Sequence, residues 1–235
     1  MTRYELNRRE LLAGAAVLGA ASLAPRAARA QAAKPPKAGG TSVWAAETDP
    51  VALNPITNSN FSSTQGFEHC YESLTGYDSR MRIIPALAER WDTPDDNTYI
   101  FHLRPGVKFH DGSELTAEDV KYTFDIVLNP KGPAVWRGNF DQVDRVDVVD
   151  RQTVKFTTKA PFPPLLGALA ILRSSAIIPR GAMEKLKLET QVVGTGPYRL
   201  VEYVPKSHVK LKRNPEYWGK PLPYIEDVTF RVLEE

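Results

Sequence analysis

Residues 101–120, FHLRPGVKFHDGSELTAEDV, bring together side chains that could do chemistry. His102 and His110 are of a type that binds zinc, and Asp111, Glu114 or Glu118 could complete such a site. A metal-dependent hydrolase is therefore one hypothesis for this sequence.

The predicted backbone argues against a shared metal site. Pro105-Gly106 predicts a tight turn, so the residues on either side of it are expected to form a hairpin in which His102 lies opposite Phe109. Because neighbouring side chains on a strand alternate between faces, His102 and His110 would then point to opposite sides. One metal ion cannot easily reach both, and the sequence predicts no metal site here.

The acidic residues of this stretch have a structural explanation. Thr116 followed by Asp119 is a variant of the capping box, and the apolar spacing over 120–128 predicts a helix that ends before Pro130. Glu118 would lie in the first turn, where the helix dipole favours negative charge. No GxSxG, HExxH or Walker motif occurs, so the sequence gives no sign of an enzyme.

The glycines of GTGPY, residues 194–198, resemble a phosphate-binding loop only superficially. Pro197 lacks the amide donor that such a loop needs, and Arg199 stands where a third glycine belongs. We therefore expect a tight turn that enters a strand, and no cofactor.

The first 30 residues have the pattern of an export signal. A charged start precedes the apolar run LLAGAAVLGAASLA, and the small residues that follow predict cleavage between Ala30 and Gln31. Arg8 and Arg9 resemble a twin-arginine signal, and a Sec signal with a chance arginine pair is the alternative. Either route predicts a soluble protein of the periplasm.

Charge and cysteine content exclude other classes of function. The formal net charge is +2, and the signal holds five arginines against two glutamates, which leaves −1 (2 − 3) for the rest of the chain. This balance predicts no nucleic-acid surface. Cys70 is the only cysteine, so no internal disulfide can form, and we expect a buried thiol.

The remaining pattern is that of a mixed α/β chain. After a flexible lead-in over 31–40, a strand is expected at 41–46, followed by a long polar loop and a helix within 66–77. Further along we expect two strands around Asp150-Arg151-Gln152, an apolar helix over 160–172, a hairpin turning at Pro205-Lys206-Ser207 and a last strand after 224.

Two blocks of the sequence resemble the family 5 extracellular solute-binding proteins, which are the peptide, oligopeptide and nickel binding components of ABC importers. Residues 87–128 are similar to the family's signature region, and residues 192–232, with GTGPY and NPEYW, to its return segment. The resemblance implies an α/β fold like that of the two-lobed periplasmic binding proteins of type II. Only lobe one would be present, with 41–70 and 178–235 as its outer part and 71–177 as an inserted subdomain, and the second lobe would be missing.

The resemblance also implies a function. A periplasmic protein of this family closes around a solute, here expected to be a peptide, and delivers it to the permease and ATPase of an ABC importer. A nickel chelate, an opine or an oligosaccharide are alternative solutes, because the whole family shares the fold. A periplasmic metal-dependent hydrolase and a ligand-delivering partner of a membrane receptor are alternatives of other classes. We expect a monomer, and interpret the chain as a fragment.

The resemblance points to few site residues. In the family, the loop after the first strand lines the cleft, which implies ligand contacts by the amide and hydroxyl groups of Thr57, Asn58, Ser59 and Asn60. The stretch AVWRGNF aligns loosely with another cleft-facing segment and adds Trp136 and Arg137. Ordinary loop or lobe-interface roles are the alternative for all six. The family's charged anchors for peptide termini lie on the second lobe, so no ion-pair anchor is predicted.

Overall fold

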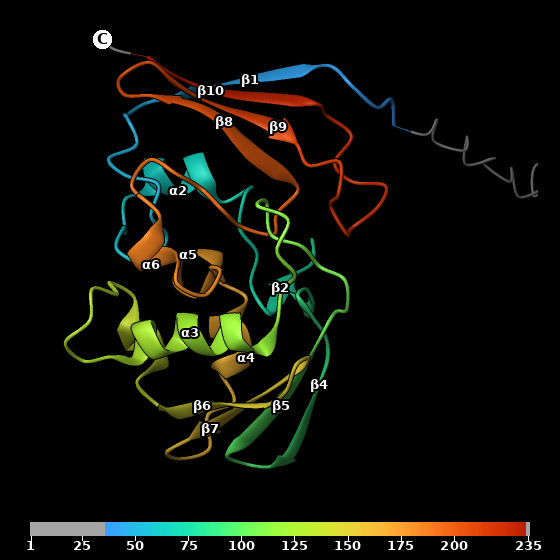
Figure 1. Cartoon of the computed structure of the whole chain (residues 1–235), viewed down its shortest axis with the longest axis vertical. Coiled ribbons are helices and arrows are strands. Elements are labelled where there is room, and N and C mark those ends of the chain that lie inside the picture. Colours follow the sequence, from blue (N-terminus) through green and yellow to red (C-terminus); the bar gives the residue numbers. More distant parts are fainter. Residues whose placement is uncertain (1–35, 234–235) are drawn as a thin grey trace, which may run out of the picture. The chain divides into compact units, whose positions relative to one another are not determined.

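The computed structural model describes residues 36–233, and the compact unit that begins at Lys37 contains all the elements described below (Figure 1). The predicted export signal, its arginine pair and the cleavage point between Ala30 and Gln31 lie outside the described residues. Within residues 36–233, no helix has the length and apolar character needed to cross a membrane.

The first sheet is formed by strands from the two ends of this unit. Its order is β1-β10-β9-β8. β1 runs parallel to β10, whereas β10, β9 and β8 are antiparallel. The strands are β1 (Thr41–Ala46), β8 (Tyr198–Val204), β9 (His208–Arg213) and β10 (Asp227–Val232). The expected first strand, the hairpin turning at 205–207 and the last strand are thus confirmed.

One face of this first sheet is packed against α2 (Phe61–Phe67). Val209 and Phe230 are buried there, and the His69 ring stacks on Phe230 with a centroid distance of 5.7 Å. Gly66 of α2 lies so close to β9 that an added Cβ would come within 3.6 Å of Val209 Cγ2. The end of α2 and the residue pair that follows it are therefore held against this sheet.

The second four-stranded sheet is antiparallel, in the order β4-β5-β7-β6. It is covered by α3 (Ala117–Leu128), whose Phe124 ring lies 4.8 Å from that of Phe156 on β7 and 5.2 Å from that of Phe140. The strands are β4 (Ala88–Asp95), β5 (Thr98–Leu103), β6 (Val143–Asp150) and β7 (Thr153–Thr158). The two strands expected around residues 150–152 are confirmed.

The start of α3 follows the expected capping pattern. The Thr116 backbone N–H donates to Asp119 Oδ2 at 2.8 Å, which satisfies one donor that the helix itself leaves unpaired. Asp119 Oδ1 also accepts the N–H of Arg180 at 2.8 Å. The carboxylate of Asp119 is therefore used in hydrogen bonds that hold the start of this helix.

The hairpin predicted around Pro105-Gly106 is wrong. β5 pairs with β4 and β7, so His102 lies opposite Arg90 and Thr153 rather than opposite Phe109. Residues 107–110 belong to no strand, and Lys108 forms only an isolated bridge with Glu114. A turn is present, with Gly106 at φ +72°, but it leads the chain away from the sheet.

The helix expected within 66–77 is also wrong. Asn60 caps α2 through its side chain, which accepts the N–H of Ser62 at 2.9 Å, so the helix starts earlier and ends at Phe67. Residues 75–77 instead form β2 (Thr75–Tyr77), which pairs with β3 (Ile83–Pro85). The expected apolar helix at 160–172 is divided into α4 (Leu165–Leu169) and α5 (Leu172–Ser175). The remaining short helices are η1 (Arg137–Phe140) and α6 (Ala182–Lys185).

Candidate functional site

The GTGPY turn packs tightly against residues 69–71, and we call this region the glycine junction. A Cβ added to Gly194 would lie 2.1 Å from the Cys70 carbonyl oxygen, and one on Gly196 would lie 2.6 Å from the Cys70 carbonyl carbon. The Gly196 N–H donates to that Cys70 oxygen at 3.0 Å, and Cys70 is fully buried as expected. The glycines therefore allow two backbones to approach closely, as a tight turn and not as a phosphate loop.

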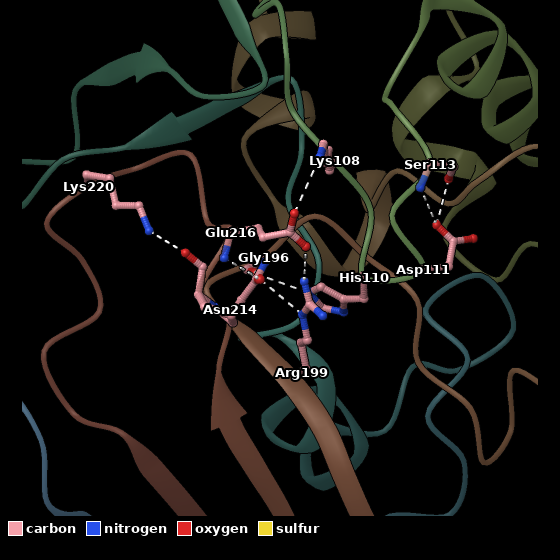
Figure 2. A network of polar contacts seen from close by, with 10 residues as sticks. Lys108, His110, Asp111, Ser113, Gly196, Arg199, Asn214, Glu216 and Lys220 are labelled. Carbon is pink, nitrogen blue, oxygen red and sulfur yellow. Dashed lines mark hydrogen bonds and ion pairs between the residues drawn. The ribbon is translucent and has the colours of Figure 1, made fainter.

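His110 is built into the glycine junction. Its Nε2 lies 3.1 Å from the carbonyl oxygen of Gly196 (Figure 2). Its Nδ1 accepts the N–H of Gly194 at 3.4 Å. Burial lowers the pKa of His110 to about 4, which keeps the ring neutral at neutral pH. Both ring nitrogens are thus engaged by the protein itself.

His102 lies in a different environment and has its own partner. Its Nε2 on β5 is 2.8 Å from Asp92 Oδ2 on the edge strand β4 of the second sheet. Within residues 36–233, no group of three or more His, Cys, Asp and Glu side chains could hold a metal ion. The geometry therefore gives the hydrolase hypothesis no support. The reason is the separate partners of the two histidines and not the predicted hairpin, which does not form.

A polar network extends from the glycine junction to the NPEYW segment. Asn214 Nδ2 donates to the carbonyl oxygen of Gly196 at 3.2 Å, and Arg199 donates to Asn214 Oδ1 and Glu216 Oε2, both at 3.0 Å (Figure 2). Lys108 adds a 3.3 Å ion pair with Glu216. The hydrogen bond from Arg199 is the main reason why the pKa of Glu216 is lowered. The network joins segments far apart in the sequence.

Glu72 is a half-buried acceptor beside the glycine junction, and sequence reasoning did not single it out. Its carboxylate accepts hydrogen bonds from Trp218 Nε1 and Tyr217 Oη at 2.8 Å and from Thr195 Oγ1 at 2.9 Å. Burial raises the pKa of Glu72, and these hydrogen bonds oppose the rise. Because its oxygens bind donors of the protein, we assign Glu72 a structural role.

A hollow at the end of the first sheet is the best candidate for a ligand site. β1 and β10 are parallel, so their carboxyl ends lie at the same edge, where ligands bind in open α/β sheets. The hollow has a volume of about 470 Å³, within the usual range for small-molecule sites. Its lining comes from the end of β1 and the start of α2: Ala45, Glu47, Thr48, Asn60, Phe61, Ser62 and Gln65.

The loop residues predicted from the resemblance divide into structural and exposed groups. Asn58 is buried, its Nδ2 donates to the Ala52 carbonyl at 2.9 Å, and its Oδ1 accepts the Asn60 N–H at 2.7 Å. Thr57 is half-buried, whereas Ser59 and Asn60 are exposed. Of the predicted residues, Asn60 lines the hollow, and Asn58 holds the loop in shape.

The second predicted segment lies beside this loop. The Val135 N–H donates to the Ile56 carbonyl oxygen at 3.2 Å, which joins the residues immediately before Trp136 to those before Thr57. The Arg173 guanidinium lies 4.7 Å from the centre of the Trp136 ring. The structure thus brings both predicted segments to one region.

Arg137 has a local partner in this region. Its Nη1 donates to Asp141 Oδ1 at 2.8 Å, within the η1 turn. Glu47, Phe61 and Gln65 line the hollow but were missed in the sequence. Glu47 directly follows β1, whereas Phe61 and Gln65 lie within α2, and only these positions could have indicated them.

Comparisons with known proteins agree on the family. The sequence profile of the bacterial extracellular solute-binding proteins, family 5 Middle, matches residues 82–235. The glutathione-binding protein GsiB of Pectobacterium atrosepticum is 34% identical over 200 residues, which are 81% of this chain and 39% of that protein.

Two solved structures agree on the fold. The periplasmic binding protein DppA from Helicobacter pylori, in complex with peptide STSA, has a TM-score of 0.76 and 27% identity, over 84% of this chain and 43% of that one. The binding protein AgaA from A. tumefacien R10, in complex with agropinic acid, has a TM-score of 0.77 and 27% identity, over 83% of this chain and 40% of that one. The chain spans about two fifths of the length of these relatives. It has the fold of the periplasmic binding proteins and belongs to the bacterial extracellular solute-binding proteins of family 5.

Proposed function

We propose that this chain is the lobe-one part of the substrate-binding component of an ABC importer, and that the complete protein captures a short peptide in the periplasm. The observation that carries this proposal is the hollow at the carboxyl ends of β1 and β10, in a chain of family 5. Its polar lining suits a solute with amide and charged groups. The similarity to a glutathione-binding protein and to a peptide-bound structure supports a peptide rather than an oligosaccharide.

The proposed mechanism is closure of two lobes around the solute. A ligand that contacts both lobes only in the closed form shifts the population toward that form by its difference in affinity. The described unit would supply one wall, with Ser59, Asn60 and the loop beside Trp136. The permease and ATPase would then receive the solute from the closed form.

The proposed division of lobe one is compatible with the two sheets. The strands of the first sheet come from 41–46 and 198–232, and those of the second from 88–158. We therefore keep 41–70 and 178–235 as the proposed outer part and 71–177 as the proposed insertion. The glycine junction, with residues 69–71 and 194–198, would connect them.

Titration of the isotope-labelled chain, followed by NMR, tests the proposal. Glutathione and trialanine should shift the amide signals of residues 57–62 and 135–137, with dissociation constants in the millimolar range because one wall alone makes the contacts. Ser59→Ala should weaken these shifts, whereas Ser79→Ala, an exposed serine in the β2–β3 turn, should not. Shifts by agropinic acid or a nickel–histidine chelate alone would contradict a peptide ligand and favour those solutes.

Export is tested separately. When the chain is expressed with its first 30 residues, N-terminal sequencing of the periplasmic protein should find Gln31 first. Replacement of Arg8 and Arg9 by lysine should block export if the twin-arginine route is used and leave it intact if the Sec route is used. An uncleaved protein in the cytoplasm would contradict the proposed location.

A further inference from the structure

A serine, a histidine and a glutamate form a chain of hydrogen bonds at the turn between β8 and β9. Ser207 Oγ lies 2.8 Å from His208 Nδ1, and His208 Nε2 lies 3.1 Å from Glu202 Oε2. Lys210 Nζ also donates to Glu202 Oε2, at 2.6 Å. None of these four residues lines the hollow at the end of the first sheet. The arrangement is that of a nucleophile, a base and a group that orients the base.

The glutamate determines which nitrogen of His208 carries the proton. Hydrogen bonds from Lys210 and His208 lower the pKa of Glu202, so its side chain is a carboxylate that can only accept. His208 Nε2 therefore donates its N–H to Glu202, and in the neutral ring Nδ1 then has a free lone pair. Because Ser207 Oγ faces that lone pair, its hydroxyl donates to His208. The imidazole is thus placed to remove the proton of Ser207.

The backbone holds this serine at an exposed position. The Ser207 N–H donates to the Val204 carbonyl at 3.0 Å, and the Ser207 carbonyl accepts the Val232 N–H at 2.8 Å. Lys206, the preceding residue, has a φ of +61°, a conformation that residues other than glycine rarely adopt. Ser207 is exposed, whereas the His208 side chain is only 19% exposed. The hydroxyl is therefore accessible to a reagent, and the ring beside it is largely covered.

Other serines and histidines of residues 36–233 do not share this arrangement. Ser113 is also exposed, but its hydroxyl donates to a carboxylate at 2.6 Å and not to a ring nitrogen. His102 is bonded to a carboxylate, and His110 to backbone groups. Within residues 36–233, Ser207 is the serine whose hydroxyl is hydrogen-bonded to a histidine.

We propose that Ser207 is a reactive serine that takes an acyl group from an activated ester, with His208 as general base and Glu202 as the residue that positions the ring. Ser207 Oγ attacks the carbonyl carbon of the ester while its proton passes to His208 Nδ1. The bond between that carbon and the departing oxygen breaks, and the departing oxygen takes the proton from His208. The products are an O-acylserine and an alcohol or phenol. This inference goes beyond solute binding and does not depend on it.

Treatment of the 235-residue chain with p-nitrophenyl acetate, followed by peptide mass spectrometry, tests this inference. Ser207 should be acetylated at least about tenfold faster than the exposed Ser79 and Ser113, which is the low side of general-base assistance because the site is open to solvent. Hydroxylamine should remove the acetyl group, which distinguishes an ester on serine from an amide on a neighbouring lysine. Ser207→Ala should abolish this labelling. Equal labelling of the three serines would overturn the proposal.

Further variants separate the base from the residue that positions it. His208→Gln should reduce acetylation of Ser207 to the level of Ser113, and unchanged acetylation would overturn the role of the histidine. In His208→Ala, added imidazole should restore the faster acetylation of Ser207 relative to Ser113, which a loss of folding would not allow. Glu202→Gln should give a rate between those of the unmodified chain and of His208→Gln. The matched control is His102→Gln, in which another histidine bonded to a carboxylate is removed, and it should leave acetylation of Ser207 unchanged.

Discussion

Around Gly194 and Gly196 the polar groups bond to one another, whereas around Glu47 they face solvent. Both nitrogens of His110 at the glycine junction, and the carboxylate of Glu72 beside it, bind partners within the protein. The hollow, by contrast, exposes Glu47 and the ring of Phe61. The glycine junction thus stabilises the fold, and the hollow leaves polar groups accessible to a ligand.

This difference explains why the most distinctive motifs are poor guides to the binding site. GTGPY and NPEYW carry much of the family resemblance, and both lie at the glycine junction, where close backbone approach and buried hydrogen bonds restrict the residue type. The loop of the candidate site has looser requirements, so its chemistry can change with the solute. Substitutions at the glycine junction should therefore lower stability more than binding, and substitutions in the loop should lower binding more than stability.

The largest expected effect is a loss of stability in Gly194→Ala. The added Cβ would lie 2.1 Å from the Cys70 carbonyl oxygen and 2.7 Å from Tyr71 Cδ1, so the backbones must move apart. We expect the free energy of unfolding to fall by about 3 kcal/mol, at the upper end for overpacking. Urea unfolding followed by tryptophan fluorescence measures this. Gly138→Ala, where nothing lies within 4 Å of an added Cβ, is the control, and equal losses in both variants would contradict the close-approach argument.

A similarly large effect is expected from pH at His110. Its pKa is about 4 in the folded chain, chiefly because of burial, against an ordinary value of 6.5. Since the unfolded chain takes up the proton first, the stability that the neutral ring contributes is complete above pH 6.5 and is lost as the pH falls toward 4. The shift corresponds to roughly 3 kcal/mol.

The variant His110→Gln isolates this contribution. Glutamine can still donate to the Gly196 carbonyl but does not titrate, so the difference in unfolding free energy between the two proteins should change between pH 6.5 and 4. Urea unfolding at half-unit steps of pH measures that difference. A constant difference over the whole range would mean that the His110 pKa is not shifted by the junction.

The sequence predicted those elements whose signals are local. Thr116 with Asp119 marked the start of α3, and the segment around Lys206 marked the β8–β9 turn, because capping and turn chemistry need only a few residues. The hairpin at Pro105-Gly106 failed for the opposite reason. β5 instead pairs with the preceding β4 and with β7, and pairing with β7, some 50 residues further along the chain, leaves no local mark.

The candidate site was predictable only in part. Family resemblance led to Asn60 and to the neighbourhood of Trp136, and the structure places the two segments side by side through the Ile56–Val135 hydrogen bond. Glu47 and Gln65 were missed because the hollow exists only where the end of β1 meets the start of α2. Their roles in binding remain predictions. These predictions depend on how the strands pair in space, which the sequence alone does not show.

The smallest expected effect lies within the loop itself, where Asn58 and Ser59 are neighbours with different tasks. Asn58→Ala removes the partners of the Ala52 carbonyl and of the Asn60 N–H, so we expect the free energy of unfolding to fall by about 1–2 kcal/mol. Ser59→Ala should change it by less than about 0.5 kcal/mol, because the side chain is exposed. Urea unfolding and trialanine titration of both variants measure the two properties. If Ser59→Ala weakens binding while Asn58→Ala mainly lowers stability, then two adjacent residues serve binding and folding separately. If Asn58→Ala weakens binding and Ser59→Ala lowers stability, Asn58 must turn toward the ligand when the site is filled.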